Sequence, residues 1–392
     1  MKPLAGITVV ALEQAVAAPF ATRQLADLGA RVIKIERPGS GDFARDYDRT
    51  VNGLSSHFVW LNRSKQSLTL DLKLGEAKGV MRRLVARADV FIQNLAPGAA
   101  ERLGFGAAAL RAEHKRLIVC NVSGYGPDGP YRDKKAYDLL VQAEAGVLAI
   151  TGTADEPAKC GIPVADIAAG MYAYSGILGA LFARERTGEG ATLDVSLLDA
   201  LAEWMGYPAY YTDYGGTAPA RSGSYHAAVA PYGPFSAGDG KSVLLSIQNE
   251  REWEWFCTSV LEKPEMTKDP KFASNSDRVR NRDELHRRIG EVFHRLTVDQ
   301  VVERLERARI AYGRMRSVEE FLEHPQLAAR QRWGEMDSPA GRLWALQPPV
   351  DIAGLTPEFG PVPEVGAHSD AILGELGYSS AEIVGLRTSG AI

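Results

Sequence analysis

The segment Ile7-Thr8-Val9-Val10-Ala11-Leu12 is a run of β-branched and aliphatic residues, which predicts a buried strand. A helical pattern follows, with Pro19 in a favourable first-turn position and an end near Gly29. The next run, Arg31-Val32-Ile33-Lys34-Ile35, predicts a second strand. Strands that alternate with helices are joined by crossovers and form a parallel sheet. These residues therefore predict an α/β fold with an open parallel sheet in a Rossmann-like arrangement.

The same alternation continues for about a hundred residues. Further strands are expected at 67–72, 89–93 and 117–123, with helices at 75–88 and before Leu103. The alternating pattern ends after about residue 195, and residues 206–240 are rich in Gly, Pro, Tyr and Ser. A strand at 242–247 and helices at 250–261, 280–296 and 298–308 follow. We predict a large domain from residues 1–200 and 325–392, a linker at 201–224 and a smaller α+β domain at 225–324.

Composition excludes several classes of protein. The 392 residues are 45% hydrophobic and 24% charged, and the formal net charge is −4, which argues against nucleic acid or an anionic membrane as the main partner. No run of about 18 apolar residues suggests a membrane span. Cys120, Cys160 and Cys257 lie far apart without a CxxC pair, which is typical of a reducing compartment. We expect a cytoplasmic enzyme or binding protein.

The sequence lacks the common cofactor and hydrolase motifs. Residues 13–18, which connect the first strand to its helix, contain no glycine, so the dinucleotide-binding fingerprint is missing. The seven histidines include no HExxH motif or ligand-like spacing, and no GxSxG elbow occurs. We therefore expect neither a metal nor a permanently bound cofactor.

One acidic residue stands out by its position. Asp166 ends the segment 161–166 and is followed at once by an apolar helix rich in Gly and Ala. An Asp before a helix is commonly an N-cap, whose carboxylate accepts from unpaired N–H groups. The same geometry would keep a carboxylate ionised in an apolar pocket, as a carboxylate nucleophile requires. The residues alone leave both interpretations open.

Basic residues gather near the expected strand ends. Arg37 and Lys73 each follow a strand, Arg102 follows a turn, and Lys134 and Lys135 precede a tyrosine. Ligands of open parallel sheets bind at the carboxyl ends of the strands, and several cations there suit a polyphosphate. Each of them alone is equally an ordinary solvated surface charge.

Taken in order, these features resemble the class III CoA-transferases of the CaiB/BaiF type, the family of formyl-CoA transferase and carnitine CoA-transferase. The resemblance covers nearly the whole chain. Its matching segments are 3–7, 28–42, 62–65, 70–73, 89–94, 97–98, 102–105, 123–126, 324–327 and 366–368.

The resemblance implies that Asp166 is the nucleophile that attacks an acyl-CoA thioester, giving an anhydride and then an aspartyl-CoA thioester. It assigns an oxyanion-stabilising loop to residues 221–226, with Gly223, Ser224 and His226 as candidates. It also implies an interlocked homodimer. The CoA contacts that it implies are Val16, Ala17, Arg37, Leu70, Asp71, Leu72, Lys73, Asn94, Leu95, Arg102, Lys134, Lys135, Ala136 and Tyr137.

The chain departs from relatives at two positions that bear on its activity. Val16 stands where formyl-CoA transferase has Gln, which weakens a claim to formyl or oxalyl substrates. The α-methylacyl-CoA racemases share the fold, but this chain has Tyr137 where they have a His; a Tyr of ordinary pKa about 10 is a poor proton exchanger at neutral pH. A racemase-like isomerase and a non-catalytic acyl-CoA binding protein are the alternatives.

Three segments, 204–208, 248–253 and 310–314, look like the branch that acts on itaconate, mesaconate, citramalate and succinyl-CoA. A dicarboxylate needs a cation for its distal carboxylate, and Arg221 or Arg314 could provide it. We therefore expect a CoA-transferase whose partners are an acyl-CoA and a short dicarboxylic acid, with no nucleic acid or membrane partner.

Overall fold

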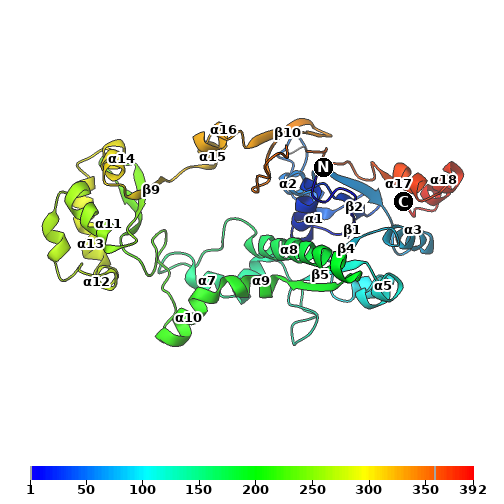
Figure 1. Cartoon of the computed structure of the whole chain (residues 1–392), viewed down its shortest axis with the longest axis horizontal. Coiled ribbons are helices and arrows are strands. Elements are labelled where there is room, and N and C mark those ends of the chain that lie inside the picture. The colour runs from blue at the N-terminus through cyan, green and yellow to red at the C-terminus, as the bar shows by residue number, and fades with distance from the viewer. Residues whose placement is uncertain (1, 357–358) are drawn as a thin grey trace. The chain divides into compact units, whose positions relative to one another are not determined.

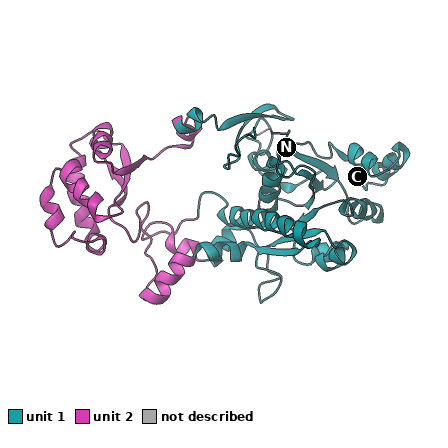
Figure 2. Cartoon of the chain, in the orientation of Figure 1, with its two compact units in different colours: residues 1–145, 160–205, 326–392 teal, residues 146–159, 206–325 magenta. Residues whose placement is uncertain are grey.

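The computed structural model describes residues 2–356 and 359–392. The chain divides into two compact units: residues 1–145, 160–205 and 326–392 form the first, and residues 146–159 and 206–325 form the second (Figure 2). This division differs from the expected domains. Residues 146–159 fall with the second unit, and the expected linker 201–224 is divided, with residues 201–205 in the first unit and residues 206–224 in the second.

The first unit contains a six-stranded parallel sheet, which confirms the predicted α/β class (Figure 1). The strand order β3-β2-β1-β4-β5-β6 is that of doubly wound dinucleotide-binding folds, and it reverses direction between β1 and β4. The strands are β1 (Thr8–Leu12), β2 (Arg31–Glu36), β3 (Lys65–Thr69), β4 (Val90–Gln93), β5 (Ile118–Ser123) and β6 (Thr192–Ser196).

Helices connect and cover these strands. Those of the first unit are α1 (Ala17–Asp27), η1 (Phe43–Asp46), α2 (Ser56–Asn62), α3 (Gly75–Val85), α4 (Ala99–Leu103), α5 (Ala107–Glu113), α6 (Asp138–Glu144), α8 (Val164–Thr187), α9 (Leu197–Trp204), α17 (Ser369–Glu375) and α18 (Ser380–Thr388). Helices α3, α5, α17 and α18 share one core with the strands, in which Ile33, Phe91 and Val119 are buried. The helix α16 (Pro325–Ala329) lies at the boundary between the units.

Helix α8 packs closely on α1 and also contacts β5 and β6. A Cβ atom at Gly170 would lie 2.7 Å from the Ala17 carbonyl oxygen and 3.1 Å from Phe20. The small residues of this helix therefore allow the close backbone approach that the sequence suggests. Within the described part of the chain, α8 is the one helix whose length and apolar composition would suffice to cross a membrane.

Strand β3 begins two residues earlier than predicted and ends three residues earlier. Lys65 opens the strand because its ammonium group pairs with buried Glu13, an interaction that local sequence does not reveal. The ladder ends after Thr69, the partner of Glu36 at the end of β2, and Leu70 N–H then donates to the Glu36 carbonyl. Residues 70–73 are consequently a loop at the sheet edge.

The second unit has a three-stranded antiparallel sheet, with β8 between β7 and β9. The segment expected to be a connection contains helix α10, whose tyrosines pack at spacings of four: Tyr207 on Tyr211 and Tyr210 on Tyr214. The elements are α7 (Val147–Ile150), α10 (Gly206–Gly215), β7 (Tyr232–Ser236), β8 (Ser242–Ser246), α11 (Glu250–Trp255), η2 (Phe256–Val260), η3 (Pro264–Lys268), α12 (Asn275–Arg280), α13 (Arg282–Phe293), α14 (Val298–Arg307), β9 (Ala311–Arg314) and α15 (Val318–Leu322).

The sequence interpretation also missed a hairpin in the first unit. Strands β10 (Trp333–Ser338) and β11 (Gly341–Leu346) pair antiparallel around a short turn. The turn ends at Gly341, whose φ of 92° favours glycine. Met336 and Ala345 pack against Phe58 and Val59 of α2, so the hairpin gains its apolar partners from a distant part of the chain.

Candidate active site

Two adjoining cavities lie at the carboxyl edge of the sheet, beside the reversal of strand order between β1 and β4. Their volumes are about 700 and 290 Å³, and Gln14, Leu95 and Ala96 line both of them. Ligands of doubly wound sheets bind outside the strand ends at this reversal. The two cavities together therefore form the candidate site, and we call them the larger and the smaller cavity.

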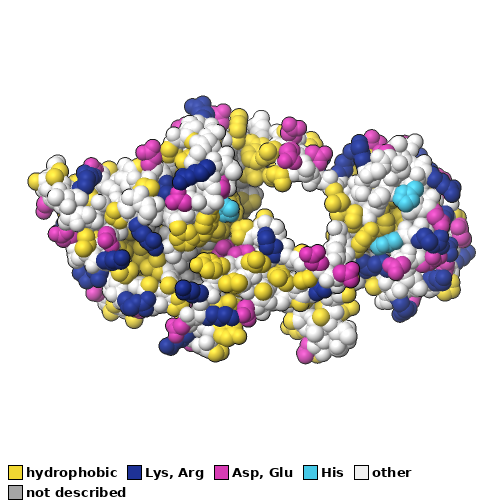
Figure 3. Space-filling view, turned by 180° about the vertical axis from the view of Figure 1, so that it is seen from behind, with side chains coloured by type: hydrophobic (Ala, Val, Ile, Leu, Met, Phe, Trp, Pro, Cys, Tyr) yellow, Lys and Arg dark blue, Asp and Glu magenta, His cyan; other side chains and the backbone are white. Residues whose placement is uncertain are grey.

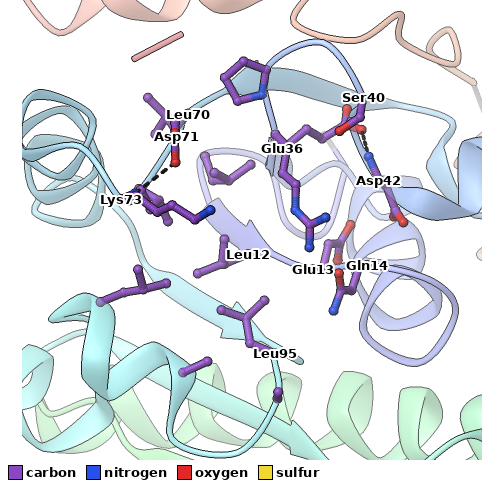
Figure 4. Close-up of a pocket in the computed structure, with 18 of the residues that line it drawn as sticks. Leu12, Glu13, Gln14, Glu36, Ser40, Asp42, Leu70, Asp71, Lys73 and Leu95 are labelled. Atoms are coloured by element: carbon purple, nitrogen blue, oxygen red, sulfur yellow. Dashed lines mark hydrogen bonds between the residues drawn. The ribbon is translucent and has the colours of Figure 1, made fainter. Parts of the chain in front are cut away.

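The larger cavity is lined by apolar side chains and by charged side chains of both signs, of which the acids are Glu13, Glu36, Asp42 and Asp71. Leu12, Leu70 and Leu95 line it together with Arg37 and Lys73, and the Lys73 side chain extends into the space (Figure 4). The backbone N–H of Lys73 donates to the Asp71 carboxylate at 3.1 Å, which fixes the turn after β3. An apolar surface flanked by two cations fits a molecule that carries both a phosphate group and a long uncharged arm.

Side chains hold the loop between β1 and α1, which contains no glycine. The Gln14 N–H donates to Asn94 Oδ1 at 2.9 Å, and Asn94 Nδ2 donates to the Gln14 carbonyl at 2.8 Å. Ala15 has a φ of 61°, and its N–H donates to Asp42 Oδ1 at 3.1 Å. A side-chain frame thus replaces the glycine-rich turn of dinucleotide-binding folds.

A buried ion-pair network lies beneath this loop. Lys65 Nζ is 2.7 Å from Glu13 Oε1, and Lys34 Nζ is 2.8 Å from Asp42 Oδ2 and 3.4 Å from Glu13 Oε1. Burial lowers the pKa of Lys65 to about 8, although Glu13 opposes this shift. Burial would raise the pKa of Glu13, but Lys65 and Lys34 outweigh it and lower that pKa. The sequence analysis did not predict this network. A lysine within an otherwise apolar strand, Lys34, is the one feature of the sequence that indicates a buried ion pair.

Asp166 lines the smaller cavity from the first turn of α8. It is not the N-cap of the helix, because α8 begins at Val164 and its N-cap is Pro163. The capping role belongs to Asp138, whose Oδ1 accepts from the N–H groups of Ala165 at 2.8 Å and Asp166 at 3.4 Å. The N-cap interpretation of Asp166 is therefore wrong, and its carboxyl group remains available to a ligand.

The surroundings of Asp166 disfavour its charged form. Burial, and then the nearby charge of Asp138, raise the pKa of Asp166 to about 7. The expectation that the helix N-terminus would keep this carboxylate ionised is thus corrected, because Asp138 takes the N–H groups and adds a like charge. A carboxyl group with this pKa is divided between its two forms near neutral pH.

The structure gathers most of the expected CoA-binding residues in the first unit at these cavities. Arg37, Leu70, Asp71, Leu72 and Lys73 line the larger cavity; Val16, Ala17, Asn94, Lys134, Lys135, Ala136 and Tyr137 line the smaller one; Leu95 lines both. Arg102 lines neither cavity, and its guanidinium donates to the Pro97 carbonyl at 3.3 Å. The assignment of these residues to CoA stays a prediction.

Two aromatic residues of the smaller cavity were not predicted. Phe43 and Tyr47, at η1 and just after it, line the cavity with Tyr137. Burial, followed by the charges of Asp42 and Asp166, raises the pKa of Tyr47 to about 12, so its hydroxyl stays protonated and can donate a hydrogen bond. No local motif marks these residues, since η1 is a single turn placed by tertiary contacts.

The candidate substrate residues of the second unit already have partners. Arg221 donates to the carbonyls of Thr153 and Ala154, each at 2.8 Å, and Arg314 pairs with Asp299 at 2.8 Å. The Arg314 pair is exposed, and such pairs exchange partners at little cost.

The neighbouring candidates are part of the same loop. The Gly223 N–H donates to the Gly152 carbonyl at 2.7 Å, and Ser224 is exposed. The His226 ring stacks on Tyr232 and accepts at Nδ1 from the Ala228 N–H. The roles assigned to these residues stay predictions. Among the residues that the structure describes, no three His, Cys, Asp or Glu side chains come together as metal ligands would.

Comparison with known proteins places this architecture in one family. A model of CoA-transferase family III matches residues 4–369. The acetyl-CoA:oxalate CoA-transferase of Acetobacter aceti is 35% identical, with 90% of each chain covered. The succinyl-CoA:glutarate CoA-transferase of Mus musculus is 33% identical over the whole of this chain and 91% of its own. A CAIB/BAIF family protein from Brucella suis has a crystal structure that superimposes with a TM-score of 0.83, at 32% identity, over 96% of this chain and 99% of its own.

The chain therefore belongs to CoA-transferase family III. The protein is accordingly a CoA-transferase, an enzyme whose substrate is a CoA thioester.

Proposed function

We propose that the enzyme moves CoA from succinyl-CoA or another dicarboxylyl-CoA to a short dicarboxylic acid, with Asp166 as the covalent carrier. The observation that supports this most strongly is the position of Asp166. Its carboxyl group lines a cavity that adjoins the larger cavity, where Arg37 and Lys73 are found. A CoA molecule held by these two cations could therefore bring its thioester toward the carboxyl group.

The steps follow from the chemistry of a carboxylate and a thioester. The Asp166 carboxylate attacks the thioester carbonyl, forming an anhydride and releasing the CoA thiolate. The thiolate attacks the aspartyl carbonyl, so the donor acid leaves and an aspartyl-CoA thioester remains. The acceptor carboxylate attacks this thioester, which gives a second anhydride and the thiolate again. Attack of the thiolate on the acceptor carbonyl yields the new acyl-CoA and restores the carboxylate.

The two anhydrides and the aspartyl-CoA thioester all require protection from water. The cavity around Asp166 is small, at about 290 Å³, and aromatic side chains form part of its wall. The Tyr47 hydroxyl, whose pKa is raised to about 12, can donate to an oxygen of the reacting carboxylates without losing its proton. These features support acyl transfer in preference to hydrolysis.

A four- or five-carbon dicarboxylic acid is the proposed acceptor. The likeness of residues 204–208, 248–253 and 310–314 to the itaconate, mesaconate and citramalate branch supports it. The Mus musculus relative also acts, by its name, on succinyl-CoA and glutarate. Arg221 and Arg314 remain the candidates for binding a distal carboxylate, and the ion pair of Arg314 with Asp299 is exposed. Val16, which lines the smaller cavity where formyl-CoA transferase has Gln, weakens the case for oxalate as the acceptor.

We further propose that the enzyme is a cytoplasmic homodimer of interlocked chains. Large apolar side chains reach the surface of the single chain (Figure 3), and exposed patches of this kind mark protein interfaces. Those that support this assembly are Phe182, Trp204, Tyr207, Tyr210, Tyr211 and Tyr214.

Trapping of the covalent intermediate tests the proposed function. The enzyme is incubated with succinyl-CoA and hydroxylamine, and its peptides are mapped by mass spectrometry. We expect an aspartyl hydroxamate at Asp166 in the wild type and none in Asp166→Asn, with CoA binding retained in both. Exchange of an α-proton without labelling would instead indicate a racemase, and binding without either reaction would indicate a passive acyl-CoA binding protein.

A further inference from the structure

Asp138 occupies an unusual position relative to the carboxyl group of Asp166. It is the first residue of α6 and lines the same small cavity. Its side chain reaches across to the first turn of α8, where Oδ1 accepts from the N–H groups of Ala165 and Asp166. Two carboxylates thus meet at one helix N-terminus, and only one of them is hydrogen-bonded to it.

The remaining N–H groups of this turn are also occupied. The Val164 N–H donates to the Ile162 carbonyl at 2.8 Å, and the Ile167 N–H donates to the Pro163 carbonyl at 3.0 Å. An acidic residue at the third helical position usually reaches back to the N–H of the N-cap residue, but here the N-cap is Pro163, which has none. Across residues 2–356 and 359–392, no hydrogen bond or ion pair holds the Asp166 carboxylate.

A second set of hydrogen bonds fixes the Asp138 side chain through its other carboxylate oxygen. Gln142, one turn further along α6 and fully buried, donates from Nε2 to Asp138 Oδ2 at 2.7 Å. The Gln142 Oε1 accepts from the Cys160 N–H at 3.0 Å, close to the start of α8. The pair therefore clamps the segment 160–166 onto α6 and fixes the orientation of the Asp138 carboxylate.

We propose that Asp138 is a positioning residue for the reaction at Asp166. The Asp138 carboxylate accepts hydrogen bonds from the N–H groups at the start of α8 in place of Asp166. The Asp166 carboxylate therefore lies in the cavity with no hydrogen bond from a backbone N–H group. A carboxylate that accepts no strong hydrogen bond keeps its lone pairs available for attack on a carbonyl. This inference rests on the proposed function of Asp166 and adds the residue that sets its reactivity.

The charge of Asp138 acts in the same direction. The groups that face Asp166 are Asp138 on α6, Tyr137 just before it, Tyr47 after η1, and the two lysines at positions 134 and 135 that line the cavity. Lys134 is already paired with Glu144, which reduces its effect on the site. The like charge of Asp138 therefore contributes to the raised pKa of Asp166, after burial.

Two substitutions separate the hydrogen bonds of Asp138 from its charge. Asp138→Asn keeps a carbonyl oxygen that can accept from the α8 N–H groups, but it removes the charge. Asp138→Ala removes both. Asp133→Asn is the control, since Asp133 is an exposed acid of the preceding loop that pairs with Arg132 and lines neither cavity.

The readouts are kcat, the KM for succinyl-CoA and the pH dependence of kcat/KM in the full-length enzyme. For D138N we expect the acid limb of the kcat/KM profile to shift to lower pH by about 1 unit, because the like charge beside Asp166 is removed. The kcat of this variant should fall less than about tenfold. For D138A we expect kcat to fall about a hundredfold, because Asp166 is misplaced. The KM should change less than about twofold in both variants, since Asp138 binds no part of CoA in this account. The D133N variant should match the wild type.

An unchanged acid limb in D138N would overturn the proposal, as would a D138A enzyme with wild-type kcat. If D138A does not fold, the pH profile of D138N alone tests the role of Asp138. Hydroxylamine labelling of wild-type Asp166 in the same preparations keeps the two hypotheses apart. Absence of that label contradicts the proposed function, whereas normal labelling with unaltered D138N kinetics contradicts only the role of Asp138.

Discussion

Gln14 and Asn94 exchange two hydrogen bonds across the point where the strand order of the sheet reverses, at 2.9 and 2.8 Å. Gln14 follows β1 and Asn94 follows β4, so the pair joins the two strand ends that flank the candidate site. A side-chain amide, with one donor and one acceptor, matches the backbone N–H and carbonyl of Gln14. The pair stabilises a loop conformation that a glycine would otherwise provide.

Replacing Asn94 with Ala should weaken acyl-CoA binding, because residues 14–17 form the wall of the smaller cavity. Two lost hydrogen bonds of about 1 kcal/mol each correspond to a rise in KM of roughly tenfold to thirtyfold. The control is Asn121→Ala, an asparagine on β5 that bonds Asp194 and lines neither cavity. Equal effects of the two substitutions on KM for succinyl-CoA would contradict this role of Asn94.

Removal of Lys65 should destabilise the protein strongly. Lys65→Met leaves Lys34, at 3.4 Å, as the remaining cation beside buried Glu13, which also accepts a hydrogen bond from Thr22. Breaking a buried pair costs about 3–5 kcal/mol. The double substitution Glu13→Gln with Lys65→Met removes the unpaired charge and should recover part of that loss. Urea unfolding measures both, with exposed Lys115→Met as a surface control expected to change stability by less than about 0.5 kcal/mol. A double variant less stable than K65M would contradict this explanation.

Two glycines of α8 should respond oppositely to substitution by alanine. A Cβ at Gly170 would meet the Ala17 carbonyl oxygen at 2.7 Å, so Gly170→Ala forces α1 and α8 apart and should cost about 1–3 kcal/mol. A Cβ at Gly179, which is exposed, meets nothing within 4 Å. Gly179→Ala should therefore stabilise the helix by up to about 1 kcal/mol. Thermal unfolding of the pair checks the expected difference in sign; two shifts of the same sign would refute the packing argument.

The raised pKa of Asp166 makes the stability of the protein depend on pH. The pKa of Asp166 is about 7 in the folded state against an ordinary value of 3.8, so the folded state binds more protons than the unfolded chain between about pH 4 and 7. The free energy of unfolding contributed by this group therefore falls as pH rises through that window. The Asp166→Asn variant has no titrating group at this position, so its free energy of unfolding does not fall in this way. Between about pH 4 and 7, its stability relative to the wild type should increase by at most about 1.4 kcal/mol per pH unit. The measurement is urea unfolding of the wild type and of Asp166→Asn at pH 4, 5.5, 7 and 8. A difference in free energy of unfolding between the two proteins that stays constant over these pH values would contradict a raised pKa at Asp166.

The parallel sheet was predictable from local signals, and a local signal also singled out Asp166, whose role as nucleophile came from the family resemblance and stays a prediction. Strand and helix patterns alternate along the first 125 residues, and Asp166 directly precedes a run of small apolar residues. The role of Asp138 was not predictable in this way, since it caps a helix 28 residues away in the chain. Lys34 and Lys65 likewise become partners of Glu13 only when β1, β2 and β3 come together in the sheet. Helix α10 was missed because its Gly, Pro and Tyr content is typical of loops.

The central claim is that the Asp166 carboxyl group exchanges an oxygen with each acid during the reaction. The measurement is a reaction of succinyl-CoA with glutarate labelled with ¹⁸O in both carboxylates, followed by mass analysis of the Asp166 peptide and of the released succinate. The account predicts that one ¹⁸O enters Asp166 in the first turnover, because the anhydride oxygen comes from the acceptor, and that later turnovers pass it to succinate. Formation of glutaryl-CoA with no ¹⁸O in either place would contradict it.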